Sequence, residues 1–292
     1  MLSKILYKEH KTMRLKISFS IKPYTKLPLN YNHFLTSAVY RYLFKADKEY
    51  SSKLHNLNSY KFFTFSWLET KKKIEGEYFK VLSDKVSWYI SSPSKDFINT
   101  VASGIIKTGT LEIGNLSLEL STIEVLGDVN FNSNVKFICI SPLVVTTKKY
   151  HKGRLMKYYY KPDDDQNEIS EKIKNNLIKK YTSFYGTQPD GTIQIKFDNN
   201  YKGNAKVLIH YIKGNLDIKI PAIMCPFEVN GSENLIKFGY ECGFGELNSS
   251  GFGMVKVVDS NITSHSNWSN DRIVLTNRKR VIKRKDRRRK IC

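Results

Sequence analysis

The 292-residue chain carries 48 Lys and Arg residues against 27 Asp and Glu residues, a formal net charge of +21, and 40% of its residues are hydrophobic. This hydrophobic fraction can form one large or two modest domains, and the excess of positive charge indicates an anionic partner. No apolar run approaches the roughly 18 residues of a membrane span, and the N-terminus lacks a signal-peptide core; we therefore expect a cytoplasmic protein that binds nucleic acid rather than a membrane.

Residues 13–133 are predicted to form a first structural unit. From Leu15 to Ile21 every second residue is apolar, the pattern of a half-buried strand. The predicted elements are, in chain order, a strand at 14–22, a helix at 34–43, strands at 63–67 and 78–91, a helix at 94–109 and a strand at 111–126. The order β-α-β-β-α-β is that of a ferredoxin-like, RRM-like unit.

Residues 134–258 are predicted to form a second unit of this kind with additional strands. A basic and aromatic loop, Thr147–Lys161, precedes a helix whose acidic start at Asp163–Asp165 suits the helix dipole. Strands are predicted at 135–145, 193–197, 205–211, 216–220 and 254–258, and helices after residue 165 and from Ser232 to Tyr240. The predicted fold class is therefore α+β, with two ferredoxin-like domains in tandem.

The two ends of the chain and the cysteines complete this organisation. Residues 1–12 are interpreted as an N-terminal extension. Residues 259–292 are interpreted as a flexible tail, because Arg278–Cys292 has ten basic residues and one acidic residue; the tail is either merely solvated or adds affinity for RNA. The four cysteines have no metal-binding spacing, so neither a metal site nor a cofactor is expected.

A glycine-rich stretch, Gly239–Val255, reads GYECGFGELNSSGFGMV and contains two Gly-Phe-Gly units. Because glycine has no Cβ, such a loop can present a bare track of N–H groups to an anionic backbone. It can equally serve only tight packing. Both interpretations stay open at the level of the residues.

Four stretches together resemble a known family: Met13–Tyr31, Leu54–Leu68, Ile140–Thr146 and the glycine-rich stretch. They occur in the order found in the RAMP superfamily, and more narrowly in CRISPR-associated endoribonucleases of the Cas-six type. The resemblance covers roughly residues 13–258. It implies tandem ferredoxin-like domains and a nuclease that cuts precursor CRISPR RNA within its repeats.

Metal-independent cleavage of RNA can use the RNA's own 2′-hydroxyl, with groups that transfer protons and a cation near the phosphate. The six histidines offer no choice by composition alone: His10, His33, His55, His151, His210 and His265. The resemblance implies His55 as the main proton-transfer group, Lys61 as the cation on the phosphate, and Tyr40 as the residue that orients or deprotonates the 2′-OH. His33 and Tyr31 are reserve candidates, and simple packing remains an alternative for Tyr40.

The remaining candidates would bind RNA without reacting. In the basic and aromatic loop Thr147–Lys161, cations that can bind phosphates alternate with tyrosines that can stack on bases. The tyrosines could also pack inward. The candidate RNA-binding residues are Lys148, Lys149, Arg154, Lys157, Gly243, Gly245, Gly251, Gly253 and Lys256. For Lys256, an ordinary exposed position on a strand is an equally good interpretation.

The resulting hypothesis is a metal-independent endoribonuclease whose partner is CRISPR repeat RNA, with other effector subunits as further candidate partners. The resemblance implies products with a 2′,3′-cyclic phosphate and a 5′-hydroxyl. The alternative is a non-catalytic RAMP-type subunit that only binds repeat RNA. Monomer and homodimer both stay open.

Overall fold

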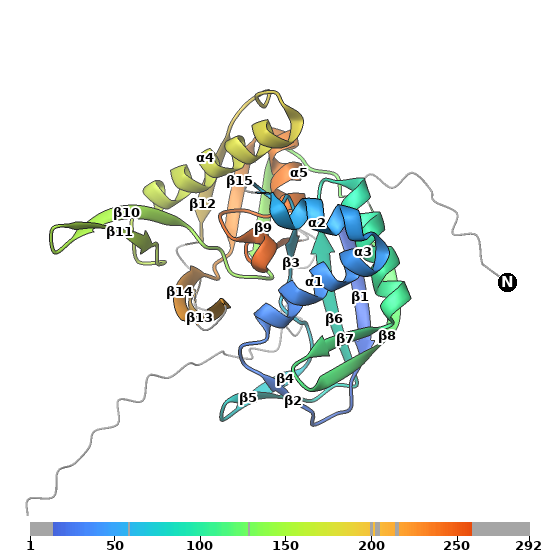
Figure 1. Cartoon of the computed structure of the whole chain (residues 1–292). Helices are drawn as coiled ribbons and strands as arrows, with labels where there is room; N and C mark the ends of the chain where they lie inside the picture. Colours follow the sequence, from blue (N-terminus) through green and yellow to red (C-terminus); the bar gives the residue numbers. More distant parts are fainter. Residues whose placement is uncertain are drawn as a thin grey trace, which may run out of the picture.

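A computed structural model describes residues 14–57, 59–127, 129–198, 201, 205–213 and 216–258 (Figure 1). The predicted N-terminal extension and basic tail lie outside these residues. Two sheets with their helices lie side by side, one built from the first half of the chain and one from the second. The predicted α+β class, with antiparallel sheets, is confirmed.

The first half is organised around a five-stranded antiparallel sheet. Its strands are β1 (Arg14–Ser20), β3 (Thr64–Phe65), β6 (Lys85–Ser91), β7 (Thr110–Ile113) and β8 (Leu116–Val125). They lie in the order β3-β6-β1-β8-β7, with β1 in the middle. The predicted strand is confirmed: its apolar residues Leu15, Ile17 and Phe19 are fully buried, and Ile17 lies between Trp88 of β6 and Ile123 of β8. The strand is more than half-buried, because Arg14 and Ser18 are buried as well.

Helices α1 (Asn32–Ala46) and α3 (Lys95–Thr108) pack against each other and on this sheet. Helix α3 begins at the predicted cap Ser94, whose side chain accepts a hydrogen bond from the N–H of Phe97, and ends at Gly109 in the left-handed conformation. A short helix, α2 (Lys48–Asn56), follows α1 directly and was not among the predicted elements. The α1–α2 corner positions the candidate site.

The second half is organised around a four-stranded antiparallel sheet. Its elements are β9 (Asn134–Cys139), β12 (Ile193–Phe197), β15 (Phe227–Gly231), β16 (Val255–Val257), α4 (Gln166–Tyr185), α5 (Glu233–Cys242) and the 3-10 turn η1 (Asn248–Ser250). The strand order is β12-β15-β9-β16. Strand β15 was not predicted, and the first predicted strand ends at Cys139 rather than at residue 145.

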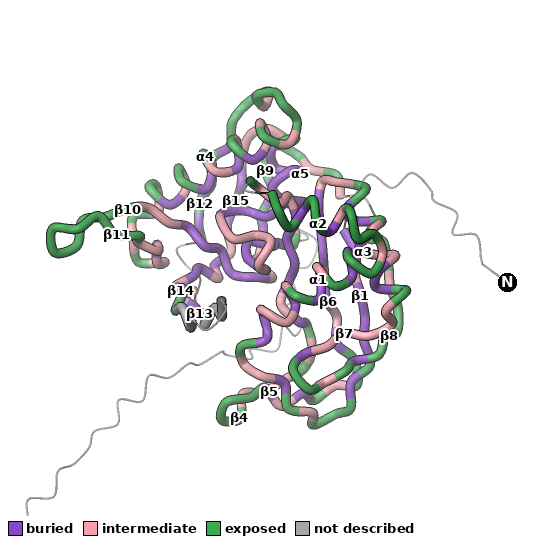
Figure 2. The backbone as a smooth tube through the Cα atoms, in the orientation of Figure 1, coloured by how far each residue is buried: buried purple, intermediate pink, exposed green. Residues whose placement is uncertain are grey.

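Three smaller sheets complete the fold. They are formed by β2 (Lys26–Pro28), β4 (Lys72–Glu75) and β5 (Tyr78–Val81), by β10 (Thr146–His151) and β11 (Arg154–Tyr159), and by β13 (Lys206–Lys213) and β14 (Leu216–Ile223). The prediction of a loop at 147–161 is wrong, because these residues form the β10–β11 hairpin. The hairpin extends away from the body and is exposed along most of its length (Figure 2).

Buried polar contacts join the two halves. Arg14 of β1 donates from Nη1 to the carbonyl of Val255 at 2.8 Å and from Nη2 to the carbonyl of Tyr240 at 2.7 Å. Its guanidinium carbon lies 3.6 Å from the centre of the Tyr240 ring. The Ser91 hydroxyl donates to the carbonyl of Glu241 at 2.8 Å. These contacts fix β1 and β6 against the end of α5 and the strand that follows it.

Candidate active site

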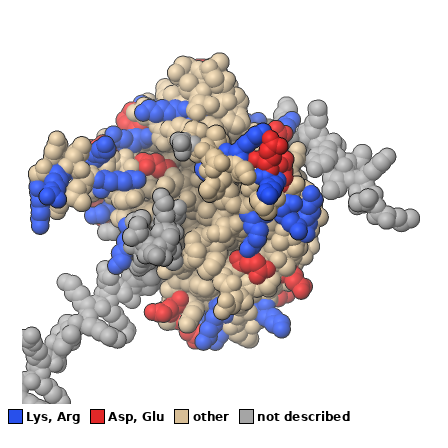
Figure 3. All heavy atoms as spheres, viewed as in Figure 1, with Lys and Arg blue, Asp and Glu red and all other residues tan. Residues whose placement is uncertain are grey.

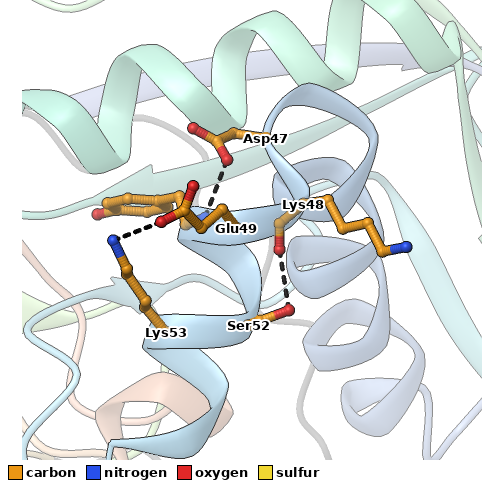
Figure 4. A network of polar contacts seen from close by, with 6 residues as sticks. Asp47, Lys48, Glu49, Ser52 and Lys53 are labelled. Carbon is orange, nitrogen blue, oxygen red and sulfur yellow. Dashed lines mark hydrogen bonds and ion pairs between the residues drawn. The ribbon is translucent and has the colours of Figure 1, made fainter.

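The α1–α2 corner is held by contacts encoded in the sequence around Asp47. The Asp47 carboxylate caps α2 by accepting from the N–H of Tyr50 at 2.9 Å (Figure 4). Within the same helix, Glu49 of the first turn and Lys53 form an i,i+4 ion pair at 2.8 Å. Leu54 packs into the first core, so the following residue, His55, is directed outward.

The structure brings Tyr40, His55 and Lys61 together. The rings of Tyr40 and His55 meet edge to face, with centroids 5.5 Å apart. The Lys61 Nζ lies 5.3 Å from the centre of the Tyr40 ring and donates to the carbonyl oxygen of His55 at 2.9 Å. A phenol, an imidazole and an ammonium therefore lie close enough together to contact the same bound ligand group.

These three side chains are accessible to a ligand. His55 is exposed, and Tyr40 and Lys61 are half-buried. Beside them is a cavity of about 360 Å³ lined by Tyr40, Phe44, Ser51, Ser52, His55 and Asn56. Partial burial lowers the pKa of Lys61 from its usual value, although the ammonium remains the form that can bind a phosphate.

The reserve candidates lie in different surroundings. Tyr31 is 4% exposed; its hydroxyl accepts from the N–H of Leu68, and burial raises its pKa. His33 packs against Phe34 and is half-buried, which lowers its pKa. It precedes Tyr40 by seven residues of α1, about 10 Å along the helix axis. The structure therefore does not place either residue in the group around Tyr40.

The basic candidates of the second half lie on the β10–β11 hairpin, where Lys and Arg side chains gather at the projecting end (Figure 3). Lys148 and Lys157 are directly opposite each other in the register, and Arg154 pairs with His151 near the tip. The Lys149 Nζ lies 4.3 Å from the centre of the Tyr158 ring. Tyr150 is 79% exposed, so its ring is available for stacking.

The glycines of the glycine-rich loop are buried and closely packed. A Cβ at Gly253 would overlap the carbonyl oxygen of Phe244, and one at Gly251 would overlap the Phe65 ring. The N–H groups of Gly243, Gly251 and Gly253 donate to the carbonyls of Gly239, Asn248 and Pro142. The expected open track of donors is therefore wrong for these three glycines, because internal hydrogen bonds already occupy their N–H groups. Gly245 is buried as well, against the carbonyl of Val144.

A buried lysine that the sequence analysis missed organises this loop. Lys180 of α4 is 3% exposed and donates to the carbonyl of Gly243 at 2.6 Å, the carbonyl of Gly245 at 3.2 Å and the Asn248 Oδ1 at 2.9 Å. Burial lowers its pKa. The available signal was its position on the apolar face of α4, three residues after the buried Leu177.

The other candidates add no second site. Lys256 is exposed on β16, and His151 is exposed at the hairpin tip. His10, His265 and the side chain of His210 lie outside the described residues. Within the described ranges, no three His, Cys, Asp or Glu side chains come together in a way that could hold a metal ion, and no helix there is long and apolar enough to cross a membrane.

Comparisons with known proteins identify the family. Residues 26–124 match the model "CRISPR-associated protein Cas6, N-terminal", and residues 126–257 match "CRISPR associated protein Cas6, C-terminal". CRISPR-associated endoribonuclease Cas6 1 of Methanocaldococcus jannaschii is 34% identical over 249 residues, which cover 85% of this chain and 94% of that protein.

Two solved structures agree with this result. One, described as "CRISPR associated protein Cas6", has a TM-score of 0.72 at 32% identity; the other, described as "An RAMP protein binding different RNA substrates", has a TM-score of 0.71 at 29% identity. Each match covers 85% of this chain and 100% of the solved chain. The chain therefore belongs to the Cas6 family of CRISPR-associated endoribonucleases.

Proposed function

We propose that this protein cleaves precursor CRISPR RNA within its repeats by a metal-independent attack of the 2′-hydroxyl. The observation that carries the proposal is the meeting of Tyr40, His55 and Lys61 beside one open cavity. An imidazole, whose unperturbed pKa is about 6.5, can give or take a proton near neutral pH. The neighbouring ammonium supplies the positive charge that a phosphorane requires.

The proposed reaction is an internal transesterification. The 2′-oxygen forms a bond to phosphorus while the bond from phosphorus to the 5′-oxygen breaks. The proton of the 2′-hydroxyl leaves as the new bond forms, and the 5′-oxygen takes up a proton as it departs. The products are a 2′,3′-cyclic phosphate and a 5′-hydroxyl.

The three side chains have different roles in this reaction. His55 is the main proton-transfer group, and Lys61 stabilises the charge on the phosphorane. Tyr40 orients or deprotonates the 2′-hydroxyl. The bond from Lys61 to the carbonyl of His55 holds the cation beside the imidazole.

The organisation of the chain is proposed to be a tandem of ferredoxin-like domains, residues 13–133 with the reacting groups and residues 134–258 with the glycine-rich loop. The support is that four strands of the first sheet, β3-β6-β1-β8, have the same order as the four strands of the second, β12-β15-β9-β16. In each, the first and third strands of the unit are central neighbours: β1 and β6 in one, β9 and β15 in the other. In each, a helix connects the first strand to the second, α1 in one and α4 in the other.

The repeat RNA is proposed to extend from the α1–α2 corner toward the second half. The exposed cations of the β10–β11 hairpin, Lys148, Arg154 and Lys157, are suited to bind its phosphates, and Lys149 lies beside Tyr158. Lys256 on β16 is a further candidate contact. The cleaved RNA would pass to other effector subunits as a guide.

The decisive experiment incubates the protein with repeat RNA in EDTA. Cleavage should persist, a single 2′-deoxy substitution at the scissile nucleotide should abolish it, and His55→Ala should slow it about 10²–10⁴-fold. The matched control is His33→Ala, which removes a histidine of the same half outside the group. Loss of cleavage on chelation would reject the mechanism. A gel that shows bound but uncut RNA would support the alternative, a non-catalytic RAMP-type subunit.

A further inference from the structure

An aromatic side chain at the edge of the cavity has no role in the reaction described above. Phe44 follows Tyr40 by four residues of α1, so the two side chains project from the same face of the helix, about 6 Å apart along its axis. Phe44 is 53% exposed although it lines the cavity together with His55. Its ring therefore presents apolar surface to solvent next to the reacting groups.

The groups around this ring are those that bind a nucleotide. The Lys48 Nζ lies 5.6 Å from the centre of the Phe44 ring, and its side chain points away from the Glu49–Lys53 ion pair (Figure 4). A cation in this position can meet a phosphate on the same side as the ring. Asn56 also lines the cavity, and its amide can both donate and accept hydrogen bonds.

The size of the cavity limits what it can hold. At about 360 Å³ it lies near the lower end of the roughly 300–1,000 Å³ range of ligand pockets. A single planar group suits this space. Isolated exposed hydrophobic residues are common. Phe44 differs from them because the Lys48 ammonium lies beside its ring, and the Asn56 amide and the His55 imidazole line the same cavity.

We propose that Phe44 is a stacking platform for one unpaired nucleobase next to the scissile phosphate, and that Lys48 binds an adjoining phosphate. This inference rests on the proposed function and specifies the state of the substrate there. A nucleobase stacked on Phe44 cannot be stacked within a continuous duplex. The nucleotide is therefore single-stranded or flipped out, and its identity matters little because every base has a π-face.

The experiment measures binding of repeat RNA made uncleavable by a 2′-deoxy substitution at the scissile nucleotide. Phe44→Ala should raise the Kd about 5- to 150-fold, the range expected for one base–aromatic stack. Phe44→Trp should bind at least as well as the wild type. Phe44→Leu, which keeps apolar volume without an aromatic face, should bind nearly as weakly as Phe44→Ala.

A second RNA separates stacking from a structural role. Abasic substitutions are placed singly at the nucleotides that flank the cut, and at one of them the wild type and Phe44→Ala should bind equally well. The matched control is Tyr24→Ala, because Tyr24 is 69% exposed with Lys80 over its ring but lies outside the cavity. Tyr24→Ala should leave the Kd of every one of these RNAs unchanged.

Two results would overturn the inference: a penalty from Phe44→Ala that is the same on every abasic RNA, or no penalty on intact RNA. Both measurements use uncut RNA. Failure of the wild type to cleave in EDTA would therefore reject the proposed reaction and leave the stacking test interpretable.

Discussion

Replacement of Lys180 by methionine should destabilise the protein by about 2–4 kcal/mol. The methionine keeps the apolar stem of the side chain within the core but removes the ammonium. The carbonyls of Gly243 and Gly245 and the Asn248 Oδ1 then lose a donor in a buried loop. An unsatisfied buried acceptor costs about 1–3 kcal/mol. Three such acceptors cost about 3–9 kcal/mol together. Removing the ammonium also removes its desolvation penalty of several kcal/mol, which leaves a net loss of about 2–4 kcal/mol.

The assay is urea-induced unfolding followed by circular dichroism, with the midpoints compared at constant slope. Lys179→Met is the matched control, because Lys179 is the preceding residue of the same helix and is exposed; its effect should stay within about 0.5 kcal/mol. The reasoning is refuted if the two variants lose the same free energy of unfolding, or if Lys180→Met loses less than about 0.5 kcal/mol.

The pH dependence gives a second test of the same residue. Burial lowers the pKa of Lys180 below its usual 10.5, so the folded protein holds fewer protons than the unfolded chain as the pH approaches 10.5. The contribution of Lys180 to the free energy of unfolding therefore increases as the pH rises. Lys180→Met should lack that gain, and Lys179→Met should keep it.

Three further predictions concern other parts of the molecule. Because burial lowers the pKa of Lys61, single-turnover cleavage should slow as the pH rises through that pKa, and Lys61→Arg should shift the decline to higher pH; identical alkaline limbs would contradict this. Lys148→Glu removes the repulsion from Lys157 opposite, so it should stabilise the fold by about 0.2–1 kcal/mol in urea unfolding. The same change should also reduce RNA affinity, measured by filter binding at several salt concentrations. The plot of the logarithm of the binding constant against the logarithm of the salt concentration should become less steep, by about 0.7 for each phosphate that the protein no longer neutralises. Gly76→Ala should lower the free energy of unfolding by about 1–2 kcal/mol because of its positive φ alone, since within the described residues an added Cβ there meets nothing within 4 Å. Gly253→Ala also clashes with a carbonyl, so it should lower that free energy further; thermal unfolding measures both.

The sequence best predicted those elements in which the spacing of apolar residues matches the spacing of buried positions. The alternation from Leu15 marks β1 because one face of that strand is buried in the sheet. The β10–β11 hairpin escaped prediction for the opposite reason: both of its faces are largely exposed, so it shows no alternation of apolar and polar residues. Strand β15 was missed although Phe227 and Val229 are its buried residues, because two apolar positions between Pro226 and Gly231 are too few to distinguish a strand from a loop.

The candidate site also has features that the sequence could predict and features that it could not. Tyr40, His55 and Lys61 come from consecutive elements, so a resemblance in motif order could bring them together before any coordinates were known. The cavity that Phe44 lines depends on the angle between α1 and α2, which no local pattern specifies. The role of Lys180 depends on partners 63 to 68 residues away in the chain, so its sequence neighbours gave no sign of them.

The glycine-rich loop is expected to affect the proposed cleavage even if no glycine touches RNA. It contacts both elements that flank the proposed site: the Asn32 amide at the start of α1 donates to the carbonyl of Ser250 at 2.9 Å, and the Thr64 hydroxyl in β3 donates to the carbonyl of Phe252 at 2.8 Å. Tyr40 lies on that helix, and Lys61 lies three residues before Thr64. A shift of the loop would therefore change the separation between the phenol and the ammonium. Loss of cleavage in a glycine variant is evidence for an RNA contact only if its binding of uncut RNA weakens while its unfolding midpoint stays unchanged; a slower rate at unchanged affinity indicates displacement of the reacting groups.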